Sequence, residues 1–143
     1  MFAVIRVRGI RKIKPRIKKT LELLRLHKPN HCVIVRDSPT VKGMLNVAKD
    51  YIAYGVIDDK MIAKLLYKRG KIGSIFLRDK IDKKTIEEIA KEIFEGKKKV
   101  SEVVDPVFCL HPPRKGYKNI KLHYPRGDLG RHDDISKLLN RML

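Results

Sequence analysis

The spacing of apolar residues in the first 56 positions changes repeatedly between the pattern of a strand and that of a helix. Residues 2–9, 31–36 and 51–56 are short strand-like segments. Two segments with apolar residues three or four positions apart lie between them, beginning at Pro15 and at Ser38. Ser38-Pro39 is typical of a helix start, with serine as the N-cap and proline in the first turn. This part of the chain therefore predicts the order β-α-β-α-β.

The remaining residues predict a helical segment followed by a mainly irregular one. Helices are expected over 59–68 and 83–95, the second with Phe94 on its inward face, then a strand over 107–110, a loop over 111–134 and a short terminal helix. The chain thus divides into a core (1–56), a helical insert (57–105) and a C-terminal segment (106–143). We expect an α+β fold with helices on one face of a small antiparallel sheet. The other face stays free, and Arg6 and Arg8 point toward it.

The formal net charge is +18, from 34 Lys and Arg against 16 Asp and Glu. It is unevenly distributed: residues 1–36 carry +10, 37–55 are neutral, 56–105 carry +3 and 106–143 carry +5. Like charges repel one another in the folded state, and a polyanion is the usual partner that offsets this repulsion. The net charge favours a nucleic acid over a small molecule as the partner. Its uneven distribution indicates that the two ends of the chain bind the nucleic acid.

The basic stretch from Arg6 to Lys19 has eight Lys or Arg among fourteen residues, and no acidic residue precedes Glu22. Cations on a strand, a turn and a helix start can bind phosphate groups together with the free N–H groups of the helix. Such contacts give affinity and position but do not read a base sequence. The alternative interpretation is an ordinary solvated surface.

The loop over 111–134 contains three prolines and three glycines among Lys, Arg, His and two tyrosines. Aromatic rings and guanidinium groups stack on unpaired bases, and glycine permits close approach of the backbone, which suits folded RNA. A loop of this length needs a partner to become ordered, so we expect RNA, rather than a protein core, to order it. A flexible surface loop is the alternative.

No pattern predicts catalysis, a cofactor, a metal or a membrane span. Cys32 and Cys109 lack the spacing of zinc ligands and sit in apolar strand-like runs, so buried thiols in a reducing cytoplasmic setting are expected. The acidic residues occur among lysines, no nucleophile constellation is present, and the apolar runs are too short for a transmembrane helix.

Two motifs in the first half match a known family in fixed register. Thr20-Leu21-x-x-Leu24-x-Leu26-x-Lys28-x-x-His31-x-Val33 is followed, after ten residues, by Met44-Leu45-x-x-Ala48-x-x-Tyr51-Ile52. With the strand Ile5–Arg8 and the helix start at Asp37–Met44, this resembles the L30 family of large-subunit ribosomal proteins over about residues 1–55. His111-Pro-Pro-Arg114 and Gly127-x-x-Gly130-Arg131-His132 before a closing helix are similar to the longer archaeal form.

The resemblance implies a ferredoxin-like core and a structural, non-catalytic role in the large ribosomal subunit. It implies contacts with large-subunit rRNA, in some lineages near the small rRNA of the same subunit, and with neighbouring ribosomal proteins. The alternative is a free nucleic-acid-binding protein of chromatin or of ribosome assembly. The residues expected to contact RNA are basic or aromatic: Arg6, Arg8, Arg11, Lys12, Lys14, Arg16, Lys19, Arg36, Lys42, Lys49, His111, Arg114, Lys115, Tyr117, Lys118, Arg126, Arg131 and His132.

Overall fold

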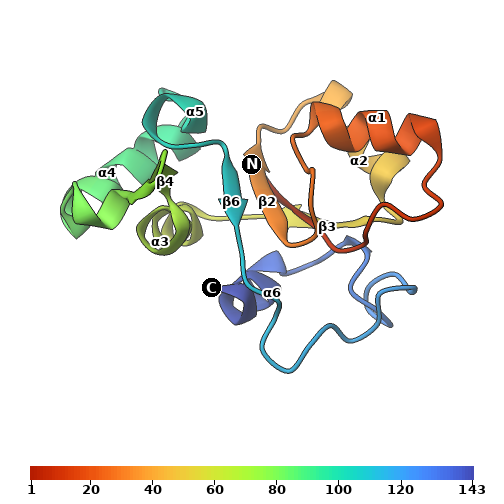
Figure 1. The fold of residues 1–143 in the computed structure, drawn as a ribbon. Helices are drawn as coiled ribbons and strands as arrows, with labels where there is room; N and C mark the ends of the chain where they lie inside the picture. Colours follow the sequence, from red (N-terminus) through yellow and green to blue (C-terminus); the bar gives the residue numbers. More distant parts are fainter.

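The structure, a computed structural model, describes residues 1–143. It begins with the expected β-α-β-α-β order, which is followed by a helical segment and two further strands of the main sheet (Figure 1). The elements are β1 (Phe2–Arg6), α1 (Pro15–Leu23), β2 (His31–Val35), α2 (Pro39–Ala48), β3 (Ile52–Val56), α3 (Asp59–Arg69), β4 (Lys71–Ile72), β5 (Ile75–Phe76), the 3-10 turn η1 (Leu77–Asp79), α4 (Lys83–Phe94), α5 (Val100–Val103), β6 (Val107–Cys109), β7 (Gly130–Arg131) and α6 (Ile135–Met142).

The main sheet has five strands in the order β6-β2-β1-β3-β7. Only the pair β3–β7 is parallel, and β1 is the central strand, with Val4 opposite both Val33 of β2 and Tyr54 of β3. β4 and β5 form a separate two-stranded hairpin. The predicted α+β class with a mainly antiparallel sheet is confirmed.

Local sequence signals correctly predicted the start of α2 and most of the buried face of α4. The Ser38 side chain accepts a hydrogen bond from the backbone N–H of Val41 at 3.2 Å, so Ser38 is the N-cap of α2 as expected. The inward face of α4 is formed by Ile86, Ala90 and Ile93, all buried. Phe94 is exposed, contrary to expectation, because the position after Ile93 lies about 100° further around the helix.

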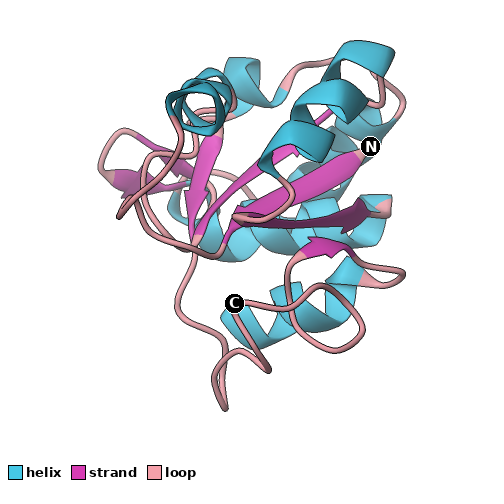
Figure 2. Cartoon of the chain, turned by 90° about the vertical axis from the view of Figure 1, so that its right-hand side faces the viewer, coloured by secondary structure: helices cyan, strands magenta, loops and turns pink.

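Both faces of the sheet are covered, so the expectation of one free face is wrong (Figure 2). Phe2 and Val4 of β1 point into a cluster of nine buried residues built with α1 and α2. Ala3 and Ile5 point into a second cluster of 23 residues, to which α3, α4 and α6, from later in the chain, contribute. All five residues of β1 are buried, because this strand lies between two helical layers.

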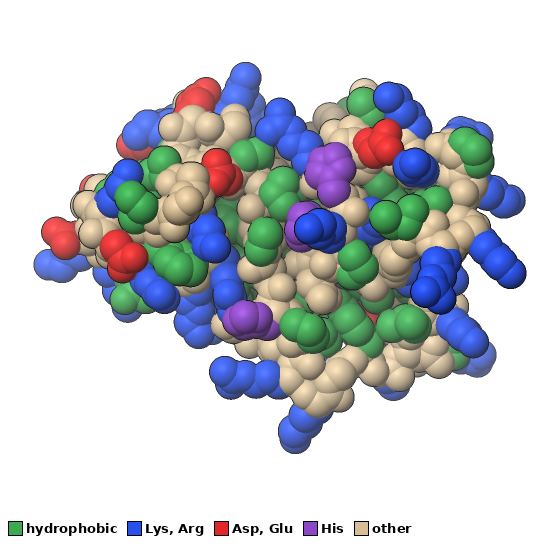
Figure 3. All heavy atoms as spheres, viewed as in Figure 1, with side chains coloured by type: hydrophobic (Ala, Val, Ile, Leu, Met, Phe, Trp, Pro, Cys, Tyr) green, Lys and Arg blue, Asp and Glu red, His purple; other side chains and the backbone are tan.

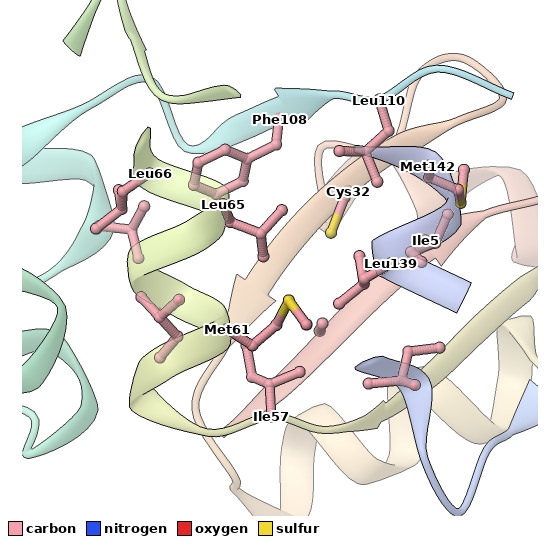
Figure 4. Close-up of a cluster of buried hydrophobic side chains, with 14 of the residues drawn as sticks. Ile5, Cys32, Ile57, Met61, Leu65, Leu66, Phe108, Leu110, Leu139 and Met142 are labelled. Carbon is pink, nitrogen blue, oxygen red and sulfur yellow. The ribbon is translucent and has the colours of Figure 1, made fainter. Parts of the chain in front are cut away.

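The 23-residue cluster includes all three segments of the chain. Figure 4 shows Leu139 and Met142 of α6 with Ile5 of β1 and Leu65 of α3. Close approach of α6 to β3 requires a glycine at position 55, since a Cβ atom there would lie 2.8 Å from the Cβ atom of Ile135. The terminal helix is therefore part of the core, not an appendage.

Strands β2 and β6 bring His31 opposite Cys109 and Cys32 opposite Phe108. Cys32 is buried, and burial raises the pKa of its thiol to about 12. Cys109 is exposed, so the expectation that both thiols are buried is wrong for this residue, which lies on the edge strand. Both cysteines are free.

We expect Leu139→Ala to lower the free energy of unfolding by about 2–5 kcal/mol, the cost of truncating a fully buried leucine. The control is Leu23→Ala, because the side chain of Leu23 is 64% exposed and its truncation leaves no buried cavity. Urea denaturation followed by circular dichroism measures both changes. Equal midpoints for Leu139→Ala and the wild type would contradict the packing of α6 into the core.

We also expect His31 to make the protein less stable in mild acid. Its pKa is lowered by burial first and by nearby Lys28 next, and its buried Nδ1 atom has no hydrogen-bond partner. The unfolded chain therefore takes up this proton more readily, and the stability contributed by neutral His31 is lost as the pH falls below about 6.5. Between about pH 7.5 and pH 5, His31→Gln should lose less free energy of unfolding than the wild type. A pH dependence of stability for His31→Gln equal to that of the wild type would refute this role.

Candidate RNA-binding surfaces

The segment between β1 and α1, together with the first half of α1, presents a row of cations that we call the N-terminal basic edge: Arg8, Arg11, Lys12, Lys14, Arg16 and Lys19. Its start is fixed by the backbone N–H groups of Val7 and Arg8, which both donate to the carbonyl oxygen of Tyr51 at 2.9 and 3.2 Å. The guanidinium of Arg8 lies 5.0 Å from the centre of the Tyr51 ring, a cation–π contact, and the other five side chains are exposed.

None of the cations on this edge forms an ion pair with an acidic residue of the chain. Helix α1 begins within this edge, with Pro15 in the first turn, Lys14 as N-cap, and no side-chain hydrogen bond at the N-cap. The partial positive charge of a helix start adds to that of the cations. The edge is therefore suited to an anionic partner.

Arg6 does not belong to this edge, although the sequence placed it there. Its residue is 4% exposed, and its guanidinium donates to the carbonyl oxygens of Leu26 (2.7 Å), His27 (3.0 Å) and Arg8 (2.9 Å). Burial lowers the pKa of Arg6, partly offset by Tyr51. The side chain ties the segment after α1 to β1, because the face to which it points is covered by helices.

Arg36 and Lys42 also lie elsewhere. The antiparallel register places Phe2 opposite Val35, so Arg36 lies at the end of the sheet opposite to Arg8. Lys42 pairs with Asp37 at 2.9 Å near the start of α2. These two cations therefore do not extend the N-terminal basic edge. Lys49, exposed at the other end of α2, precedes Asp50, whose carbonyl oxygen accepts from Arg8.

Arg36 instead lines a cavity of about 290 Å³ between the core and the insert. Its guanidinium donates to the carbonyl oxygen of Gly96 at 2.7 Å, and Arg25, Lys98 and Lys99 lie around the same cavity. Lys98 is paired with Glu92 at 2.5 Å. These cations were not expected as a group, since only the run of lysines at 97–99 is visible locally and its neighbours are distant in sequence.

The loop over 111–134 is fixed by the protein itself, so the expectation that only RNA orders it is wrong. The carboxylate of buried Asp128 accepts a hydrogen bond from the backbone N–H of Lys118, and the N–H of Asp128 donates to the carbonyl oxygen of Asn119 at 2.9 Å. Leu129 joins the core, and β7 pairs with β3 directly after it. These contacts with distant strands could not be read from the local composition of the loop.

Inside this loop the expected contact residues have different environments. His111, Arg114, Lys115, Lys118, Arg126 and Arg131 are exposed. His132 is buried, with Nε2 2.8 Å from the carbonyl oxygen of Asp128. Tyr117 is half-buried: its hydroxyl donates to Oδ1 of Asn30 at 2.7 Å, and burial, with a smaller effect of Asp128, raises its pKa. Tyr117 and His132 therefore support the loop, whereas Tyr124, which the sequence pattern did not distinguish, is exposed.

The N-terminal basic edge and the loop adjoin one another at the turn between α2 and β3. His123 Nε2 lies 2.8 Å from Oδ1 of Asp50, and Arg8 Nη1 donates to the carbonyl oxygen of Asp50 at 3.4 Å. Figure 3 shows that the charged side chains on the right of the molecule, where the segments before α1 and before α6 lie, are mostly Lys and Arg. Most acidic groups of this face lie on the left, over α3–α5, among further Lys and Arg. We call the edge and the exposed loop cations together the basic surface.

The same structure contains no group of three or more His, Cys, Asp or Glu side chains that could hold a metal ion. None of its helices combines the length and the apolar character that a membrane span needs. The basic surface suits an extended polyanion.

Comparison with known proteins identifies the family. The sequence model of the family described as ribosomal protein L30p/L7e matches residues 2–52. Over 99% of both chains, the sequence is 50% identical to the large ribosomal subunit protein uL30 of Archaeoglobus fulgidus. It is also 43% identical over 100% of both chains to uL30 of Methanobrevibacter smithii, and 41% identical over 99% of both chains to uL30 of Methanocella arvoryzae. The chain therefore belongs to the uL30 family of ribosomal proteins, structural and non-enzymatic components of the large subunit of the archaeal cytoplasmic ribosome.

Proposed function

We propose that the chain binds large-subunit rRNA through the basic surface and stabilises the fold of that RNA. The observation that carries this proposal is a row of cations without acidic partners, on the N-terminal basic edge, joined through Asp50 to a second group of exposed cations from the far end of the chain. Two groups of cations on one rigid body can neutralise phosphates of RNA segments that would otherwise repel each other.

Rigidity supports this mechanism. The edge is held by two hydrogen bonds to Tyr51, and the loop by Asp128, Leu129 and the pairing of β7 with β3. Ordering a flexible segment on binding costs conformational entropy, and here that cost has largely been met in folding. The surface therefore presents its cations in a fixed arrangement.

The three segments have different parts in this proposal. Residues 1–56 and 106–143 supply the RNA-binding surface, whereas the insert, 57–105, has ten of the sixteen acidic residues and carries only +3. Such a nearly neutral unit suits contact with neighbouring ribosomal proteins rather than with phosphates. The small rRNA of the subunit is a further partner implied by the family resemblance.

The competing function is that of a free nucleic-acid-binding protein of chromatin or of ribosome assembly, which would use the same charge. Sedimentation of a cell extract separates the two. A structural ribosomal component remains with the large subunit, at about one copy per particle, after a wash at moderate salt. A pool that sediments with bulk DNA, or only with immature particles, would contradict the proposal.

We expect the double variant Arg11→Glu and Lys14→Glu to bind deproteinised large-subunit rRNA more weakly than the wild type. Removing a cation that neutralises one phosphate reduces the steepness of log affinity against log salt by about one, because fewer counterions are released on binding. Filter binding over a salt series measures both quantities, with circular dichroism to check folding.

The matched control is Lys83→Glu with Lys84→Glu, which makes the same change of net charge at exposed positions of the insert. This control should bind rRNA with nearly the wild-type affinity and the wild-type salt slope, apart from a small effect of the lower net charge. Equal losses for the two double variants would show that net charge alone, not the basic surface, determines binding.

A further inference from the structure

Tyr124, in the loop over 111–134, has a ring that packs on a buried histidine and is also exposed to solvent. Its ring lies 4.6 Å, centre to centre, from the ring of His132, at an angle of 35°. His132 itself is buried, whereas Tyr124 remains 38% exposed. The tyrosine ring is therefore supported from one side by an aromatic side chain of the protein and accessible to a ligand.

The support behind Tyr124 is rigid. His132 is held through Nε2, 2.8 Å from the carbonyl oxygen of Asp128, and through its backbone N–H, which donates to the carbonyl oxygen of Tyr54 at 2.8 Å. The backbone N–H of Tyr124 donates to the carbonyl oxygen of Leu129 at 2.9 Å. The ring is thus positioned before any ligand arrives, which lowers the entropy cost of binding to it.

The surroundings of Tyr124 combine apolar and cationic groups. Ile120 and Leu122 are also exposed, so three large apolar side chains within five residues face solvent. Lys118, Lys121, Arg126 and Arg131 are exposed in the same stretch of chain. Asp128, the acidic residue within 118–131, is buried and hydrogen bonded, and Asp50 is paired with His123. A partner that matches this set presents flat apolar faces together with negative charge, as unpaired nucleotides do.

We propose that Tyr124 is a platform on which an unpaired nucleobase of rRNA stacks, on the ring face opposite His132. Exposed Arg126 and Arg131 contact the phosphates on either side of that nucleotide. This inference rests on the proposed rRNA binding and deepens it, because it adds a contact with a base to a surface otherwise directed at phosphates. Tyr117, the tyrosine favoured by the sequence, has its hydroxyl bonded to Asn30 and supports the loop from within.

The test measures binding of the full chain to deproteinised large-subunit rRNA at several salt concentrations. Loss of one stacked base weakens binding roughly fivefold to a hundredfold. We therefore expect Tyr124→Ala to weaken binding by this factor without changing the salt slope, since no charge is removed. Tyr124→Phe should bind like the wild type, whereas Tyr124→Leu, which keeps an apolar side chain but no aromatic face, should be weakened.

The matched control is Tyr67→Ala, at a tyrosine of α3 that is also 38% exposed but lies on the insert. Its affinity should equal that of the wild type. Thermal unfolding checks that each variant folds, and Tyr124→Leu provides the test if Tyr124→Ala does not.

Three results would contradict either the proposed rRNA binding or the stacking platform alone. If the wild type shows no salt-dependent binding to the rRNA, the proposed function itself fails. If the wild type binds and the folded alanine and leucine variants bind equally well, only the stacking platform is refuted. If these variants bind naked rRNA normally but wash out of intact subunits, the loop contacts a ribosomal protein instead, and the platform is again refuted.

Discussion

Strand β1 is apolar on both sides, and this single constraint determines how the rest of the molecule is arranged. Its alternate residues Phe2 and Val4, and Ala3 and Ile5, face opposite sides of the sheet, so both sides must be covered. Helices α1 and α2 cover one side, and the second cover has to come from residues after position 56. Burying the second cluster therefore places α6 against β3. The loop before α6 then lies at the end of the sheet where the N-terminal basic edge lies. Hydrophobic burial thus brings together the two basic ends of the chain.

Most acidic residues lie in a different part of the molecule from the N-terminal basic edge. Acidic residues are concentrated in the insert, where lysines such as Lys97 and Lys98 find partners in Glu95 and Glu92. At the N-terminal basic edge no cation is ion-paired with an acidic residue, and the electrostatic repulsion within that edge remains uncompensated. Under the proposed function, rRNA supplies the missing negative charge. The chain then gains stability from its partner, because a ligand that binds the folded state alone shifts the folding equilibrium.

Local patterns in the sequence were sufficient for elements whose signals are local. Serine and proline at 38–39 and the helical pattern over 83–95 correctly predicted α2 and α4, because capping and helical periodicity act within a few residues. The pairing of β7 with β3 and the hairpin β4–β5 were missed, since strands of two residues carry almost no periodic signal. Interactions between residues distant in sequence have no local signal at all. Arg6 is a cation on a strand in the sequence, and only the position of Leu26 and His27 shows that its guanidinium is used inside the protein.

The central claim is that RNA lies against the basic surface and not against the insert. Ultraviolet crosslinking of intact large subunits, followed by mass spectrometry of the peptides of this chain, tests it most directly. We predict nucleotide adducts on peptides from residues 8–19 and 111–131 and few or none on those from 57–105. Adducts concentrated on the insert, with the peptides of the basic surface unmodified or linked only to other proteins, would contradict it.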